Sequence, residues 1–108
     1  MIDHRQIDER SLAFGRAIAT KLADRPELIG RARATIDRWM RSASPRLRPA
    51  LQEWLETLEG PIEGVVALMT SRDERSTRLR QSNPFAGVLT SAERNAIIRR
   101  FAEPLADR

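Results

Sequence analysis

Apolar residues recur every three or four positions along most of the chain, which is the spacing of one buried face of an α-helix. No segment shows the strict alternation of apolar and polar residues that is typical of a half-buried β-strand. The pattern predicts an all-α protein, a single compact bundle of five to six short helices over residues 1–108. The clearest helical face lies in residues 3–24 and consists of Ile7, Ser11, Phe14, Ile18 and Leu22.

Prolines and glycines divide this pattern into separate helices. Pro26 ends the first helix and suits the first position of a second, where its missing backbone N–H is not needed. Pro49 opens a third helix, which Gly60 is placed to end, and Pro61 opens a fourth. The second helix has an apolar face of Ile29, Ala32, Ile36, Trp39 and Ala43, and the third has one of Leu51, Trp54, Leu55 and Leu58.

Two capping boxes indicate further helix starts. In a capping box, a Ser or Thr and a Glu three residues later each accept a hydrogen bond from the other's backbone N–H. Ser71 with Glu74 predicts a restart near residue 71, with an unbroken helix over residues 61–81 as the alternative. Thr90 with Glu93 predicts the start of the last helix, whose apolar face is Ala96, Ile97, Phe101 and Leu105.

Small residues lie beside the apolar face of the first helix, at Gly15, Ala19 and Ala23. Small side chains at this spacing let a second helix approach closely. Because glycine inside a helix costs roughly 1 kcal/mol relative to alanine, we expect Gly15 to have a packing role. The same small face, together with the stripe that contains Trp54, also permits a homodimer.

Residues 79–91 form the one long interruption between helices. Phe85, Val88 and Leu89 lie there beside Pro84 and Gly87, residue types that resist both helix and central strand. Loops are normally polar and run over the surface, so these apolar side chains must be buried somewhere. Either the segment plugs the end of the helical core or it docks on a protein partner. In the docking interpretation the partner-binding residues are Arg75, Arg78, Arg80, Pro84, Phe85, Val88 and Leu89.

The net charge of +4 is unevenly distributed along the chain. Residues 1–50 hold 11 basic and 6 acidic groups, whereas residues 51–108 hold 8 and 9. Clustered arginines are typical of phosphate binding. However, the helix after this basic region is acidic, which disfavours insertion into the major groove of DNA. A nucleic-acid-binding role therefore remains the alternative, and its candidate residues are Arg31, Arg38, Arg41, Arg46 and Arg48.

Residue types that perform catalysis or bind metals are sparse. The chain has no cysteine, and its one histidine, His4, has only Asp8 at helical spacing, too few ligands for a metal site. The acidic clusters at residues 3–9 and 73–74 lie at helix starts, where carboxylates normally complement the helix dipole. We therefore expect a protein that is not an enzyme and uses no cofactor or metal.

The N-terminal residues carry both acidic and basic side chains, and no apolar run follows that is typical of a signal peptide or a membrane span. The absence of cysteine is compatible with a reducing compartment. The expected location is the cytoplasm, without membrane association.

Two stretches carry a family resemblance. Residues 79–90, which read LRQSNPFAGVLT, and the following Ala92-Glu93-Arg94 resemble a segment of small bacterial helical proteins from toxin–antitoxin-like gene pairs. Residues 10–19, RSLAFGRAIA, are similar to the opening of those proteins. The resemblance covers most of the chain and implies a protein partner, such as a nucleotidyltransferase-type toxin encoded nearby. It assigns no activity to individual residues.

These observations lead to two hypotheses of function. The first is a non-enzymatic protein-interaction module, an antitoxin that binds and neutralises a cognate bacterial toxin. The alternative is a small basic nucleic-acid-binding transcriptional regulator.

Overall fold

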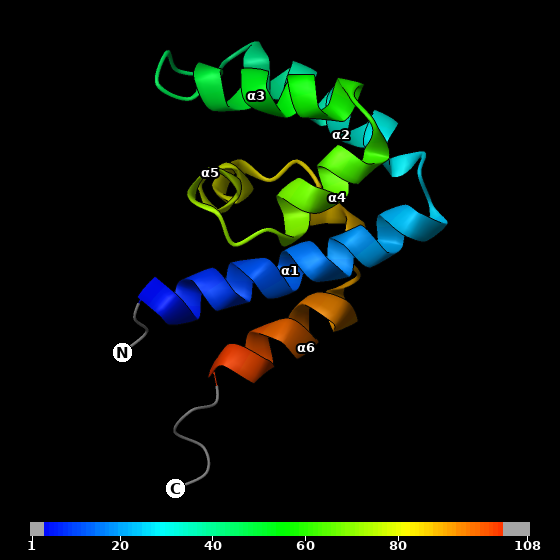
Figure 1. Ribbon diagram of the computed structural model, residues 1–108, viewed down its shortest axis with the longest axis vertical. Coiled ribbons are helices and arrows are strands. Elements are labelled where there is room, and N and C mark those ends of the chain that lie inside the picture. Colours follow the sequence, from blue (N-terminus) through cyan, green and yellow to red (C-terminus); the bar gives the residue numbers. More distant parts are fainter. Residues whose placement is uncertain (1–3, 103–108) are drawn as a thin grey trace, which may run out of the picture.

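The computed structural model describes residues 4–102, and all regular structure within that range is helical (Figure 1). The prediction of an all-α bundle of five to six helices is confirmed. Two 3₁₀ turns, η1 and η2, lie in the connection before the last helix. The elements are α1 (His4–Asp24), α2 (Leu28–Met40), α3 (Arg48–Glu59), α4 (Ile62–Thr70), α5 (Glu74–Leu79), η1 (Arg80–Ser82), η2 (Ala86–Val88) and α6 (Ser91–Ala102).

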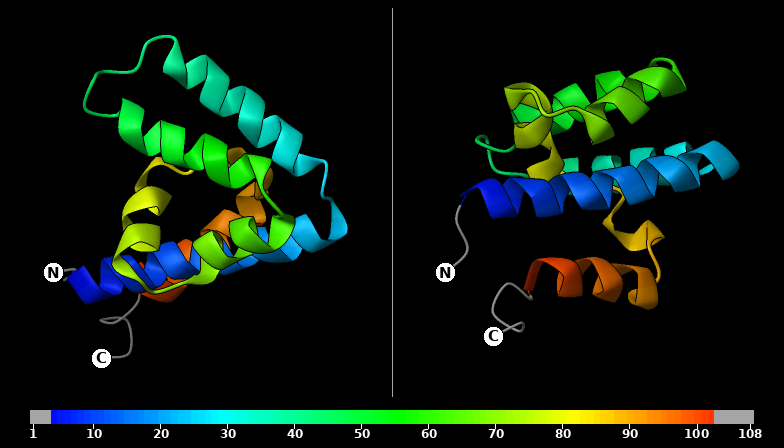
Figure 2. Two further views of the ribbon diagram at one scale, coloured as in Figure 1. Left: turned by 45° about the horizontal axis from the view of Figure 1, so that its top comes forward. Right: turned by 60° about the horizontal axis from the view of Figure 1, so that its bottom comes forward.

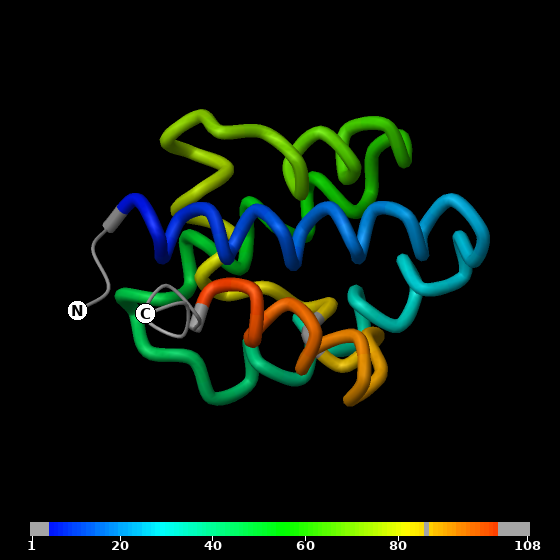
Figure 3. Tube along the Cα trace, turned by 90° about the horizontal axis from the view of Figure 1, so that it is seen from below, coloured from blue at the N-terminus to red at the C-terminus, as the bar shows by residue number. Residues whose placement is uncertain are grey.

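The long helix α1 lies in the middle of the molecule. It contacts α4 and α5 on one side, and α6 runs antiparallel along another side (Figure 2, Figure 3). α2 and α3 pack against each other as an antiparallel hairpin, and α3 also contacts α4. Residues 80–89 return the chain from α5 to the start of α6.

Helices α1 and α4 approach each other closely at Gly15. A Cβ atom added to this residue would collide with the backbone carbonyl oxygen of Met69. The expected packing role of Gly15 is therefore confirmed, and any side chain at this position would push the two helices apart. Of its small neighbours, Ala19 packs at the edge of the core, whereas Ala23 is exposed.

The core is continuous between α1, the α2–α3 hairpin and α4, and Trp54 is its largest side chain. The indole Nε1 of Trp54 donates a hydrogen bond to the carbonyl oxygen of Leu79, 2.9 Å away. Among the described residues, no buried side-chain nitrogen or oxygen lacks a hydrogen-bond partner. The large side chains that are fully buried are Leu12, Ile18, Leu22, Leu28, Ile36, Leu51, Trp54, Val65, Met69, Leu79 and Phe85.

The buried surface of α1 differs from the predicted face. Leu12 and Ala13, which lie outside the predicted stripe, are buried, whereas Ile7 is 44% exposed. Phe14 is half-buried. The reason is that α4 and α6 contact α1 from different sides, so the buried surface is wider than one stripe and is displaced from it.

Both predicted helix starts near capping boxes are present. Glu93 donates its backbone N–H to the Oγ1 of Thr90 at 3.1 Å, and Thr90 donates its own to the Oε1 of Glu93 at 2.7 Å. The chain also breaks before α5, so the unbroken helix over residues 61–81 is wrong. The cap of α5 is Asp73, however, whose carboxylate accepts the backbone N–H of Ser76 at 2.7 Å. The Oγ of Ser71 accepts the N–H of Asp73 instead.

Smaller differences affect α2 and α6. α2 begins at Leu28, two residues after its predicted start. In α6, Ile97 is buried and Phe101 is half-buried, but Ala96 is exposed, so the predicted face is wrong at that position. Leu105 lies outside the described residues.

The two surfaces that permitted a homodimer are both used within the chain. Gly15 contacts α4, and Trp54 has no exposed surface. Separately, none of the helices within residues 4–102 combines the length and the hydropathy that a membrane span needs.

Candidate functional site

The segment after α5 closes one side of the core. Phe85 is fully buried, and its ring meets that of Trp54 edge to face, with centroids 6.1 Å apart. Pro84 and Leu89 are buried as well, and Val88 is half-buried. The segment is therefore a core plug. The docking interpretation needs correction at Pro84, Phe85 and Leu89, because buried side chains offer no surface to a partner.

The predicted basic rim of a docking segment is also taken up by contacts within the chain. Arg75 and Arg78 are exposed, and both bind the carboxylate of Glu53 on α3, at 3.1 and 3.2 Å. These pairs link α5 to α3 and partly neutralise the two arginines.

Arg80 lies inside the molecule, with only 6% of its surface exposed. Its guanidinium donates hydrogen bonds to the carbonyl oxygens of Leu68, at 2.9 Å, and Ser71, at 2.7 Å. Desolvation lowers the pKa of Arg80, against the opposing fields of Asp73 and Asp8, yet an arginine stays charged in a protein. Because the last carbonyls of a helix have no partner within it, Arg80 caps the end of α4 and belongs to no rim.

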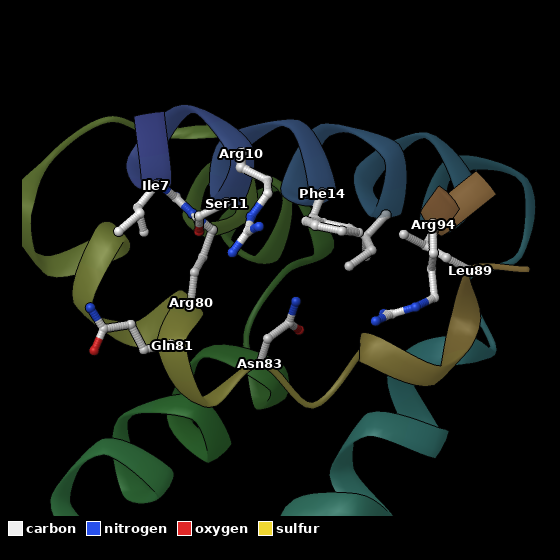
Figure 4. Close-up of a pocket in the computed structure, with 10 residues that line it drawn as sticks. Ile7, Arg10, Ser11, Phe14, Arg80, Gln81, Asn83, Leu89 and Arg94 are labelled. Carbon is white, nitrogen blue, oxygen red and sulfur yellow. Dashed lines mark hydrogen bonds between the residues drawn. The ribbon is translucent and has the colours of Figure 1, made fainter. Parts of the chain in front are cut away.

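A cleft of about 360 Å³ opens between α1, residues 80–89 and α6. Figure 4 shows side chains of α1 along one wall, with Arg10, Asn83 and Arg94 directed into the space. The apolar lining consists of Ile7, Phe14, Ile18 and Leu89, and the polar lining of Arg10, Ser11, Arg80, Gln81, Asn83 and Arg94.

The donors directed into the space of this cleft include two guanidiniums and an amide (Figure 4). The guanidinium of Arg94 lies over the ring of Phe14, 5.6 Å from its centroid. Among the described residues, neither Arg10 nor Arg94 is ion-paired. The Oδ1 of Asn83 accepts the backbone N–H of Phe85 at 2.8 Å, which leaves the Nδ2 donors for the cleft (Figure 4).

No carboxylate is among the described residues that line the cleft. Positive charge and N–H donors therefore stand beside an apolar wall without an internal counter-ion. Charge-assisted hydrogen bonds to guanidinium are strong and directional, and a few placed polar groups on an apolar wall are typical of ligand sites. The cleft suits a group that carries a carboxylate next to apolar surface.

The structure brings together two of the five arginines of the nucleic-acid alternative. Arg31 and Arg38 line a second groove, of about 270 Å³, between α2 and residues 83–88. Arg41, Arg46 and Arg48 are exposed around the connection between α2 and α3 and do not line this groove.

The acidic clusters have structural partners. Glu9 binds Arg72 through two contacts, and the hydrogen bond from Arg72 lowers the pKa of the Glu9 carboxyl. The backbone N–H of Ser76 lowers the pKa of Asp73 in the same direction. A general acid needs a raised pKa, so neither group fits that role. No three His, Asp or Glu side chains of the described residues meet to hold a metal, and the side chain of His4 is not among those described.

Sequence reasoning missed Arg10, Asn83 and Arg94 as site residues and assigned Phe14 to the core alone. A partial signal exists for Arg10, which precedes Phe14 by one helical turn and so shares its face of α1. Nothing local indicates that Arg94, on the last helix, lies over the same ring.

No family model, curated protein or solved structure matches this chain. The resemblance to proteins of toxin–antitoxin-like gene pairs stays a prediction.

Proposed function

We propose that this chain is a non-enzymatic protein-interaction module whose partner inserts an acidic, partly apolar segment into the cleft between α1 and α6. One observation carries the proposal: Arg10 and Arg94 flank an apolar wall, and no carboxylate among the described lining residues neutralises them. A partner carboxylate would supply the missing counter-ion, and an adjacent apolar side chain would cover Phe14 and Ile18.

The energetics favour a partner of this kind. A hydrogen bond to a charged group contributes about 1.5–3 kcal/mol, more than one between neutral groups. Complementary charge also accelerates association and discriminates against partners of the wrong sign. A basic partner segment would be repelled by both arginines, so the cleft selects for acidic segments.

The specific form of this proposal is an antitoxin that binds and neutralises a toxin encoded nearby. The family resemblance implies a toxin of the nucleotidyltransferase type. Covering the site of another protein requires a shaped surface and no catalytic group. The lowered pKa values of Glu9 and Asp73, and the structural partners of both side chains, are compatible with this role.

Coexpression with the product of the adjacent gene tests the proposal. We expect a tagged chain to capture that product and to rescue growth from it. Arg10→Glu with Arg94→Glu should weaken capture by more than about tenfold, since two attractive charges become repulsive.

The matched control is Arg16→Glu with Arg99→Glu. Both residues are exposed, lie on the same two helices, and are absent from the lining of the cleft. This control changes the net charge equally and should bind as the unmodified chain does. No capture by the unmodified chain, or equal losses in the two double variants, would contradict the proposal.

A further inference from the structure

The groove between α2 and residues 83–88 is a second hollow, separate from the cleft at α6. It has a volume of about 270 Å³ and shares one lining residue, Asn83, with the cleft. Its lining residues include Arg31, Thr35, Arg38, Trp39, Gly87 and Val88.

Two unpaired guanidiniums stand along this groove. Arg31 and Arg38 are seven residues apart, about two helical turns, and so lie on one face of α2. No ion pair engages either of them within the described residues, whereas Arg33, on the same helix, binds Glu59 at 3.7 Å. No carboxylate is among the described groove residues. Of the basic side chains of α2, Arg33 therefore binds the neighbouring acidic helix, whereas Arg31 and Arg38 line the open groove.

The remainder of the groove offers a flat aromatic side chain and accessible backbone. Trp39 is half-buried and lines the groove next to Arg38. Gly87 lies opposite, with no other atom within 4 Å of where its Cβ would be, so the backbone there is open. An aromatic side chain beside guanidiniums is the combination by which proteins hold a base and its phosphate.

We propose that this groove binds one nucleotide unit of a single-stranded nucleic acid, with phosphate on Arg31 and Arg38 and the base against Trp39. Guanidinium groups bind phosphate oxygens in a planar, two-pronged geometry. A duplex is disfavoured, because α3, which packs against α2, is acidic and would be repelled by the phosphates of a duplex laid across both helices. The site uses none of the charged side chains of the partner cleft, although Asn83 lines both.

Fluorescence anisotropy with a short fluorescein-labelled oligothymidine tests the proposal across a range of salt concentrations. We expect binding that weakens steeply with salt, as phosphate contacts require. Arg31→Ala with Arg38→Ala should weaken binding about tenfold or more and lower the salt dependence.

The matched control is Arg41→Ala with Arg48→Ala, which removes the same charge near one end of α2 but leaves the groove intact. It should weaken binding by less than about threefold. Equal losses in the two double variants would show attraction to net charge alone and overturn the groove proposal, as would absence of binding at low salt.

Base stacking is tested by the tryptophan emission. Oligothymidine should quench it, whereas inorganic polyphosphate of similar charge should not, since polyphosphate has no bases. Trp54 is fully buried and serves as the internal reference. Quenching that persists in Trp39→Phe, or equal quenching by polyphosphate, would contradict the assignment of Trp39.

Discussion

At the residue scale, the absence of a side chain at Gly15 lets α1 approach α4. Alanine is the better helix former by about 1 kcal/mol, so it would stabilise an open helical site. At Gly15 its Cβ meets the carbonyl oxygen of Met69, which is backbone and cannot rotate away. We expect Gly15→Ala to lower the free energy of unfolding by about 1–3 kcal/mol, measured by urea denaturation.

Gly30 provides the control for this prediction. It lies in α2, and nothing is within 4 Å of where its Cβ would be. Gly30→Ala should therefore raise the free energy of unfolding by up to about 1 kcal/mol. Equal stabilisation by both alanines would show that α1 and α4 do not meet closely at Gly15.

The carboxylate of Asp73 makes the stability of the fold depend on pH in the acid range. Hydrogen bonds from the backbone and side chain of Ser76 lower the pKa of Asp73 below its ordinary value of 3.8. The unfolded chain therefore takes up the proton first as the pH falls. The stabilising contribution is complete above the ordinary value and is lost as the pH falls through the folded-state pKa.

Asp73→Asn separates this titration from the cap itself. Asparagine is an equally good N-cap but does not ionise in this range. We expect the variant to remain folded at pH 7 and to lose less stability than the unmodified chain between pH 7 and about pH 3. Urea denaturation at several pH values provides the measurement, and identical acid profiles would contradict the role given to Asp73.

At the element scale, we predict that the segment between α5 and α6 stabilises the fold rather than binding a partner. Phe85→Ala removes a fully buried ring that packs against Trp54, and should lower the free energy of unfolding by about 3–5 kcal/mol. Val88→Ala, at a half-buried position of the same segment, should lower it by about 1 kcal/mol. Thermal and urea unfolding compare the two; unchanged stability in Phe85→Ala would instead support docking.

Elements with local signals were predictable from the sequence. The cap formed by Thr90 and Glu93 has both of its hydrogen-bonding partners within four residues, so its spacing alone predicts it. The cap of α5 was displaced from Ser71 to Asp73 because two capping residues compete within a short stretch. Local chemistry there predicts a break but does not decide which side chain caps it.

The site depended on contacts between distant elements, which periodicity does not reveal. Arg80 follows the exposed Arg75 and Arg78 in the sequence, and its own burial results from hydrogen bonds to the unpaired carbonyls at the end of α4. Likewise, Arg94 and Phe14 share a cleft because α6 runs along α1. Sequence spacing predicts which residues share a helix face but not which two faces meet.

At the scale of the whole molecule, the basic and acidic parts of the sequence lie on neighbouring helices. The basic helix α2 packs against the acidic helix α3, and Arg33 binds Glu59 across that contact. The arginines directed to the groove and the cleft, Arg31, Arg38, Arg10 and Arg94, are among those without a carboxylate partner in the described residues. The two proposed sites therefore draw on charges that the fold leaves uncompensated.

We expect the chain to be a monomer, because the surfaces that permitted a homodimer are buried within the chain. Among the described residues, the large apolar side chains more than a third exposed are Ile7, Leu47 and Ile98, and they come from three separate segments. Scattered apolar residues of this kind are normal on monomers. We expect sedimentation equilibrium to give the monomer mass of 12.3 kDa. Twice that mass, restored to the monomer by Ile7→Ser with Ile98→Ser, would instead place a self-association surface on α1 and α6, where it would compete with the proposed partner.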